Sequence, residues 1–182
     1  DVANSINNIT GQNNCKWLVM EWDGRESSGI FVGNPIGWLL RNVNSSLALF
    51  KDNGIRGFSK VLIALRPGRK NKNFITVADK ICCHFDASLT LLNIVSASEK
   101  KHKVKRIESS SKELISNTQC VSNMKIIESN SPVEAVSEES AGYDLLILGT
   151  PEKDNWIRVL FGTGEDRFVK KAACSVLRLT LK

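Results

Sequence analysis

KVLIAL, at residues 60–65, is an uninterrupted apolar run about as long as one β-strand. A second run, SLTLLNIV, occupies residues 88–95, and between the two runs apolar side chains recur at helical spacing over residues 71–85. Apolar runs without alternation are typical of strands buried on both faces, as in a parallel sheet covered by helices. The order strand–helix–strand therefore predicts an α/β fold.

The same alternation continues to the end of the chain. We expect further helices at 103–116, between Ser131 and Gly142, and at 165–173, and further strands at 124–128, 143–148 and 174–181. Ser131-Pro132-Val133-Glu134 has the pattern of a capping box with proline at the first helical position. Residues 58–182 thus form one predicted domain, with a parallel five-stranded sheet and helices on both faces in a Rossmann-like arrangement.

Residues 1–57 repeat the end of this domain and then connect to it. WLVMEW (17–22) parallels LLILGT (145–150), and residues 45–50 parallel 174–179, with an expected helix at 36–43 between them. Residues 16–50 therefore look like the last strand–loop–helix–strand of a first copy, after fifteen Asn- and Ser-rich residues that we expect to be flexible. Half a copy cannot cover its own sheet. We expect it to pack on the second domain, on a partner chain, or on a missing first half, since a chain that begins with Asp1 reads as a fragment.

The composition excludes several kinds of site. The five cysteines (Cys15, Cys82, Cys83, Cys120 and Cys174) are odd in number and form no C-x-x-C pair, and only two histidines are present. This indicates a reducing compartment, with neither a disulfide framework nor a metal site. No stretch of this sequence reaches the ~18 apolar residues of a membrane span. No nucleophile–base pair stands out, so we expect no catalytic residue.

YDLLILGT at residues 143–150, Gly162-Thr163, Phe168-Val169 and ACSVL at 173–177 resemble the closing segment of universal stress proteins. The resemblance covers most of residues 58–182 and implies a universal stress protein-like fold. The phrases VGNPIGWLL and FKDNGIRGFSKVLIAL further resemble the cytoplasmic C-terminal region of prokaryotic cation–chloride cotransporters, in the amino acid–polyamine–organocation transporter superfamily. That resemblance implies a regulatory, dimerising domain on the cytoplasmic side of the cell membrane, attached to the transporter domain of the same chain.

The resemblance also implies a place for a nucleotide. Members of this family that bind ATP use a glycine-rich loop, because glycine lets backbone amides approach phosphate. Here Glu152 stands at the middle glycine position, and Leu65 and Arg66 stand where an aspartate is expected. What remains is a residual nucleotide or anion site of Arg66, Gly149, Thr150, Gly162 and Thr163. We expect no obligatory cofactor. ATP or AMP binding is the alternative, in a nucleotide-binding stress-protein module; otherwise these glycines only shape a loop.

Three further features concern partners. The net charge is +6, and Lys100, Lys101, Lys103, Lys105 and Arg106 form a basic run. Such a run suits anionic lipid or an acidic transporter surface, and the alternative is a solvated and irregular segment. The four tryptophans, Trp17, Trp22, Trp38 and Trp156, indicate core or interface positions more than stacking on nucleic acid, so no nucleic acid partner is expected. The last strand is an apolar edge, where Val176, Leu177 and Leu179 would form a homodimer.

Overall fold

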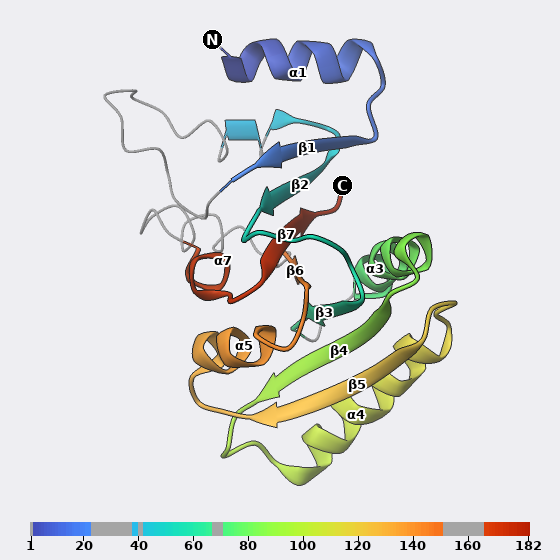
Figure 1. Ribbon diagram of the computed structural model, residues 1–182, viewed down its shortest axis with the longest axis vertical. Helices are drawn as coiled ribbons and strands as arrows, with labels where there is room; N and C mark the ends of the chain where they lie inside the picture. The colour runs from blue at the N-terminus through green and yellow to red at the C-terminus, as the bar shows by residue number, and fades with distance from the viewer. Residues whose placement is uncertain (1, 23–37, 40–41, 67–70, 151–165) are drawn as a thin grey trace.

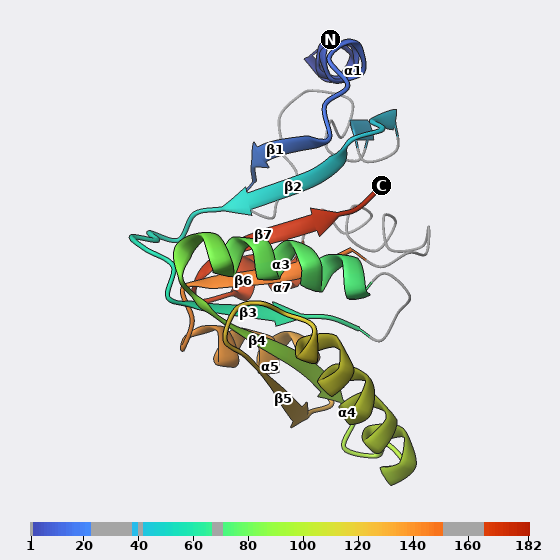
Figure 2. The ribbon, with the colours of Figure 1, turned by 90° about the vertical axis from the view of Figure 1, so that its right-hand side faces the viewer.

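The computed structural model describes residues 2–22, 38–39, 42–66, 71–150 and 166–182. These residues form a seven-stranded sheet with helices on both faces (Figure 1, Figure 2). The strands are β1 (Trp17–Glu21), β2 (Ser46–Lys51), β3 (Lys60–Ala64), β4 (Ser88–Val95), β5 (Ser122–Glu128), β6 (Leu145–Gly149) and β7 (Ser175–Thr180). The helices are α1 (Val2–Gln12), α3 (Asn71–Phe85), α4 (Lys101–Ser116), α5 (Pro132–Ser140) and α7 (Arg167–Lys171). None of the described helices is both long and apolar enough to cross a bilayer.

The predicted α/β class is confirmed, but the sheet is larger than expected. Its strand order is β1-β2-β7-β6-β3-β4-β5. Every neighbouring pair is parallel except β2 and β7, which run antiparallel. Residues 58–182 contribute the five predicted parallel strands, in the order β7-β6-β3-β4-β5. The sheet has seven strands because β1 and β2, from the N-terminal half-copy, add to it through the β2–β7 pair.

Two apolar layers hold helices onto the sheet. On one face Val61, Ile63 and Ile147 are fully buried beside Phe74 and Ala78 of α3. On the other face Leu62, Leu146 and Leu148 are buried beside Val136 of α5 and Val169 of α7. Burial of such a side chain contributes about 1.5–3 kcal/mol. The central strands are therefore apolar on both sides, as the uninterrupted runs predicted.

The repeat seen in the sequence is a repeat of structure. Trp17 lies opposite Ser46 in the β1–β2 pair, and Leu145 lies opposite Ser175 in the β6–β7 pair. This is the same register in both copies. The antiparallel β2–β7 pair joins them symmetrically, since Leu47 pairs with Thr180 and Lys51 with Val176. The two copies are thus related by a pseudo-two-fold axis that passes between β2 and β7.

The first fifteen residues are not the flexible segment that their composition predicted, because Val2–Gln12 form α1. The helix buries Ala3 and Thr10, and Ala3 and Ile6 belong to the same apolar cluster as Leu18 and Met20 of β1. In the second copy α5 precedes β6 in the same way (Figure 1). The helix therefore depends on tertiary contacts, which outweigh the weak helix propensity of its Asn and Ser residues.

Two predictions about local contacts need correction. Ser131 precedes α5, but its side chain makes no capping hydrogen bond, so the predicted capping box does not form. Glu134 instead accepts a hydrogen bond from Lys171 Nζ at 2.7 Å, linking α5 to α7. The apolar run at β1 has the pattern of a strand buried on both faces, yet Trp17 and Val19 are exposed.

The apolar edge predicted at β7 is already occupied. Val176, Leu177 and Leu179 lie on β7 opposite Lys51, Phe50 and Ala48 of β2. Val176 and Leu179 are buried within this chain. The backbone groups that an open edge would offer to a second subunit therefore pair with β2, so β7 is not the free edge that was predicted.

Candidate functional site

The candidate site lies where the parallel strands end. In sheets of this kind ligands bind beyond the carboxyl ends of the strands. Gly149 closes β6 and Thr150 follows it, while Arg66 follows the adjacent strand β3 and is exposed. The structure therefore brings three of the five predicted site residues to one edge. The other two, Gly162 and Thr163, lie outside the described residues.

Gly149 is required by close packing. A Cβ atom added there would lie 2.8 Å from Leu65 Cδ2 and 3.1 Å from Phe74 Cε2. Leu65 and Phe74 are both buried, so they fill the space beside the last residue of β6. The glycine is explained by this contact with β3 and α3. A side chain at this position would have to displace both of them.

Thr150 has its polar groups committed to the neighbouring strand. Its N–H donates to Leu179 O at 2.9 Å. Its hydroxyl lies 3.0 Å from the hydroxyl of Thr180, where either oxygen can donate. Thr150 is buried as well. It therefore tethers the end of β6 to β7.

A buried ion pair beneath this edge was missed at the level of sequence. Arg178 of β7 donates from Nε to Asp166 Oδ2 at 2.8 Å and from Nη2 to the same oxygen. Its Nη1 donates to Gly149 O at 3.1 Å. Both side chains are buried. The sequence did contain a signal for this pair, namely the arginine inside the apolar run SVLRLT. An unpaired charge in such a strand is very costly, so a partner for this arginine could have been expected.

Asp166 also begins helix α7. Its Oδ1 accepts hydrogen bonds from Phe168 N at 3.1 Å and from Val169 N at 3.3 Å. These are the amides that an anion would contact at the start of a helix. A carboxylate of the protein already satisfies them. The positive end of α7 is therefore used by Asp166, whose charge is balanced by Arg178.

A second polar cluster, made of cysteine thiols and the Asp79 carboxylate, lies toward the C-terminal end of α3. Asp79 accepts hydrogen bonds from Gln119 N at 2.9 Å and Cys120 N at 3.0 Å. Burial raises the pKa of Cys82 to about 11, and it also raises that of Cys120. Thiols with raised pKa values stay protonated at neutral pH and are poor nucleophiles. Among the described residues, no group of His, Cys, Asp and Glu is arranged to hold a metal ion.

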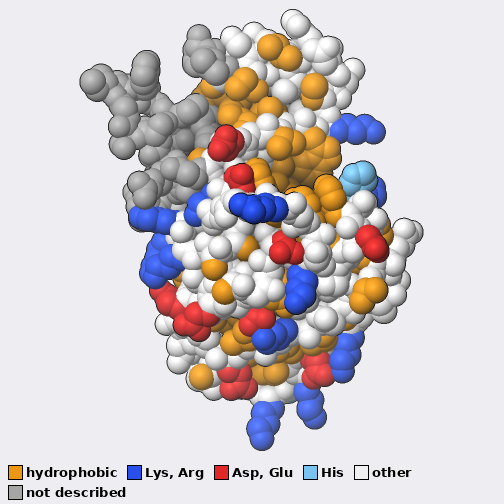
Figure 3. All heavy atoms as spheres, viewed as in Figure 1, with side chains coloured by type: hydrophobic (Ala, Val, Ile, Leu, Met, Phe, Trp, Pro, Cys, Tyr) orange, Lys and Arg blue, Asp and Glu red, His pale blue; other side chains and the backbone are white. Residues whose placement is uncertain are grey.

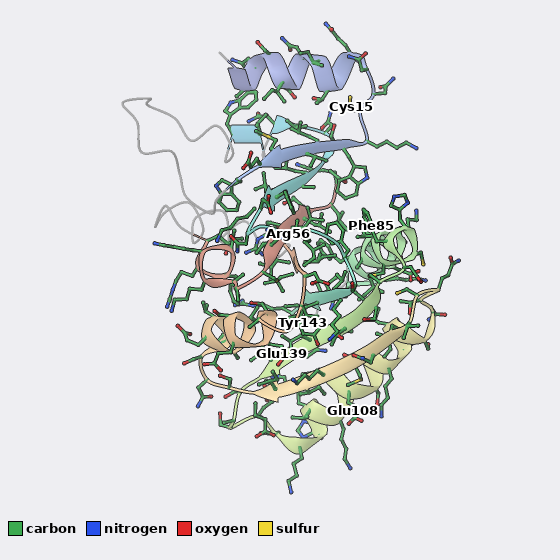
Figure 4. All side chains as sticks on the ribbon, viewed as in Figure 1. Cys15, Arg56, Phe85, Glu108, Glu139 and Tyr143 are labelled. Carbon is green, nitrogen blue, oxygen red and sulfur yellow. The ribbon has the colours of Figure 1, made fainter. Side chains whose placement is uncertain are left out.

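Two shallow hollows lie at the opposite, amino-terminal edge of the sheet. One is lined by the connector between β2 and β3 and by the starts of β6 and β7, including Arg56 and Tyr143 (Figure 4). The other lies at the end of α3, between the starts of β4 and β5. Neither hollow lies at the carboxyl-terminal edge of the strands, where the predicted residues Gly149 and Thr150 lie.

The predicted basic run is ordered. Helix α4 begins at Lys101, and Lys103 Nζ lies 2.7 Å from Glu99 Oε2. The expectation of an irregular segment was therefore wrong, because ion pairing and packing support the helix. Lys101, Lys105 and Arg106 remain exposed, and Lys and Arg side chains gather over this end of the molecule (Figure 3).

The tryptophans do not form a stacking platform in the described part of the chain. Trp22 is buried in the core, as predicted, and Trp38 is half-buried beside α1. Trp17 is exposed on β1. Trp156 lies outside the described residues. The three described tryptophans thus occupy different environments.

Comparison with known proteins places the fold. No family model matches the sequence, and no curated protein matches it. A universal stress protein from Archaeoglobus fulgidus matches 98% of this chain and 64% of its own, with a TM-score of 0.70 and 15% identity. The chain therefore spans less than two thirds of that protein. This likeness shows a universal stress protein-like fold.

Two smaller neighbours were solved with nucleotides. A universal stress protein in complex with cAMP matches 69% of this chain and 99% of its own, with a TM-score of 0.54 and 13% identity. The universal stress protein from Archaeoglobus fulgidus in complex with dAMP matches 68% of this chain and 98% of its own, with a TM-score of 0.53 and 9% identity.

Proposed function

We propose that this universal stress protein-like chain is a non-catalytic regulatory domain that acts through contacts between proteins. The observation that carries the proposal is that the buried Leu65 and Phe74 side chains pack against Gly149 at the carboxyl edge of the sheet. The Asp166 carboxylate also argues against nucleotide binding, because it already accepts hydrogen bonds from the first amides of α7. A triphosphate would meet packed side chains at this edge and would find the first amides of α7 already bound by a carboxylate.

The sequence phrases described above support a more specific proposal. The domain would belong to a cation–chloride cotransporter or related permease, on the cytoplasmic side of the membrane, and would regulate transport without carrying ions. The exposed Lys101, Lys105 and Arg106 would suit the anionic inner leaflet, where each cation contributes roughly 1 kcal/mol. A homodimer remains part of the proposal, through a surface other than β7.

The test is reconstitution of the natural polypeptide in liposomes, with and without residues 1–182. We expect cation and chloride flux to persist without the domain, with a changed rate or a changed response to conditions. A natural polypeptide that stays out of the membrane, or that carries none of these ions, would refute the transporter assignment. Liposomes with and without anionic lipid separate a lipid contact from a protein contact.

A nucleotide-binding module is the second candidate. It is favoured by the two neighbours solved with cAMP and dAMP and by the exposed Arg66 beside the end of β3. Isothermal titration of the chain with ATP, AMP and cAMP distinguishes the candidates. A Kd tighter than about 100 µM, weakened by Arg66→Ala, would replace the first proposal by this one. No saturable heat is the result that we expect.

A further inference from the structure

Two residues of β1 are exposed although their counterparts in β6 are buried. Because the register is the same in both copies, Trp17 is equivalent to Leu145 and Val19 is equivalent to Ile147. Trp17 is 40% exposed against 2% for Leu145, and Val19 is 66% exposed against 0% for Ile147. Both positions carry large apolar side chains in both copies. The difference therefore lies in what covers them.

In the second copy the cover is a strand and a helix. β3 pairs with β6 in parallel, with Val61 opposite Leu145, and α3 packs over the same face. In the described part of the chain β1 pairs only with β2, and it forms one edge of the sheet (Figure 1, Figure 2). Helix α1 packs on the other face of β1, against Leu18 and Met20. In the described part of the chain, the face of Trp17 and Val19 thus has no equivalent of β3 or of α3. Apolar side chains gather on the surface between β1 and α3 (Figure 3).

The two edges of the sheet differ in protection. The edge strand β5 carries Lys125, whose Nζ lies 2.7 Å from Glu139 Oε2, and its other exposed residues are Asn123 and Glu128. Charged side chains of this kind discourage pairing with another strand. In β1 the first four residues are apolar, and Glu21 is its one charge. An edge without such protection is typical of a strand that has a neighbour on both sides.

We propose that β1 receives a parallel strand and a covering helix that lie N-terminal to residue 1 in the same polypeptide. They would lie on β1 as β3 and α3 lie on β6, with the strand on the free edge and the helix over Trp17 and Val19. The order of the repeat supports this source, because β3 and α3 precede α5 and β6 in the chain, and α1 and β1 repeat α5 and β6. The similar protein that matches 98% of this chain is also longer, with only 64% of its length matched. The inference does not depend on an attached transporter.

Hydrogen–deuterium exchange of the natural polypeptide, compared with residues 1–182 alone, tests the proposal. We expect the amides of β1 to exchange at least about tenfold more slowly in the natural polypeptide, because a second strand would bind its free edge. Val19→Lys should remove that protection without unfolding residues 1–182, since Val19 is exposed there. Val121→Lys is the matched control, because Val121 is 79% exposed at the start of β5 and should change nothing.

Three results would overturn the proposal. Equal exchange of β1 in both proteins would show that nothing pairs with it. A natural polypeptide without a strand–helix segment before residue 1 would remove the source. Sedimentation of residues 1–182 as a dimer that Val19→Lys dissociates would assign this face to a second copy of the chain.

Discussion

Leu49 of β2 and Arg178 of β7 lie directly opposite each other, at equivalent positions of the two copies. The pseudo-two-fold axis therefore passes through this pair. The two residues differ in chemistry, since Leu49 belongs to an apolar cluster while Arg178 holds Asp166. In the sequence Gly37 stands where the second copy has Asp166. The buried charge and its partner are thus both present in one copy and both missing from the other.

The first prediction concerns the ion pair of Arg178 and Asp166. Arg178→Leu leaves the buried Asp166 carboxylate without its cation and should lower the free energy of unfolding by about 3–5 kcal/mol. The double variant Arg178→Leu/Asp166→Ser removes both charges and keeps an oxygen that can cap α7, so it should recover most of that loss. Urea denaturation of the wild type, both single variants and the double variant measures the coupling. A coupling energy near zero would contradict the role of the pair.

The second prediction concerns the close packing around Gly149. Gly149→Ala places a methyl group 2.8 Å from Leu65 Cδ2 and should cost about 1–3 kcal/mol of stability. Adding Leu65→Val should restore part of the loss, because it shortens the opposing side chain. Gly57→Ala is the control, since nothing lies within 4 Å of its Cβ position. Equal stability of the Gly149→Ala and Gly57→Ala variants would show that packing does not require this glycine.

The third prediction concerns high pH. Burial raises the pKa of Cys82 and of Cys174 from 9.0 to about 11. The unfolded thiols therefore lose their protons first, so the contribution of these two thiols to stability should be fully present below about pH 9 and should be lost as the pH rises toward 11. The double variant Cys82→Ala/Cys174→Ala should start less stable and show a shallower fall over this range. Urea denaturation at a series of pH values measures both slopes, and unchanged slopes would count against the buried thiols as the cause.

The fourth prediction concerns the cover of β7. Leu49→Pro removes a backbone donor from the middle of β2 and should disrupt the β2–β7 pair. The exposed β7 edge, with Leu177 and Leu179, should then pair with another copy. Light scattering after gel filtration should detect a larger assembly than for the wild type. A variant that is folded and no larger than the wild type would show that β7 stays protected without β2.

Much of the fold could be predicted from local pattern. The apolar runs at β3, β4 and β6 correctly indicated strands buried on both faces, and helical spacing indicated α3. The repeat also predicted which residues of β1 and β2 correspond to those of β6 and β7. These features depend on neighbours close in the sequence, so periodicity is enough to find them.

The candidate site could be predicted only in part. Arg66, Gly149 and Thr150 do meet at the carboxyl ends of neighbouring strands, because parallel strands share that edge. Their present contacts could not be foreseen. The contact of Leu65 and Phe74 with Gly149 depends on how α3 packs, and periodicity carries no distances.

Local patterns are enough to specify the α/β class, the order of the elements and the presence of a repeated half. The helical state of α1, the cover of β7 by β2, and the bonds from Arg178 to Asp166 and to the carbonyl of Gly149 depend instead on contacts between distant segments. These two groups of features differ in the sequence distance over which they arise. Hydrophobic periodicity arises within a few residues, whereas a strand edge or a buried charge finds its partner across the sheet, where geometry and burial set the free energy.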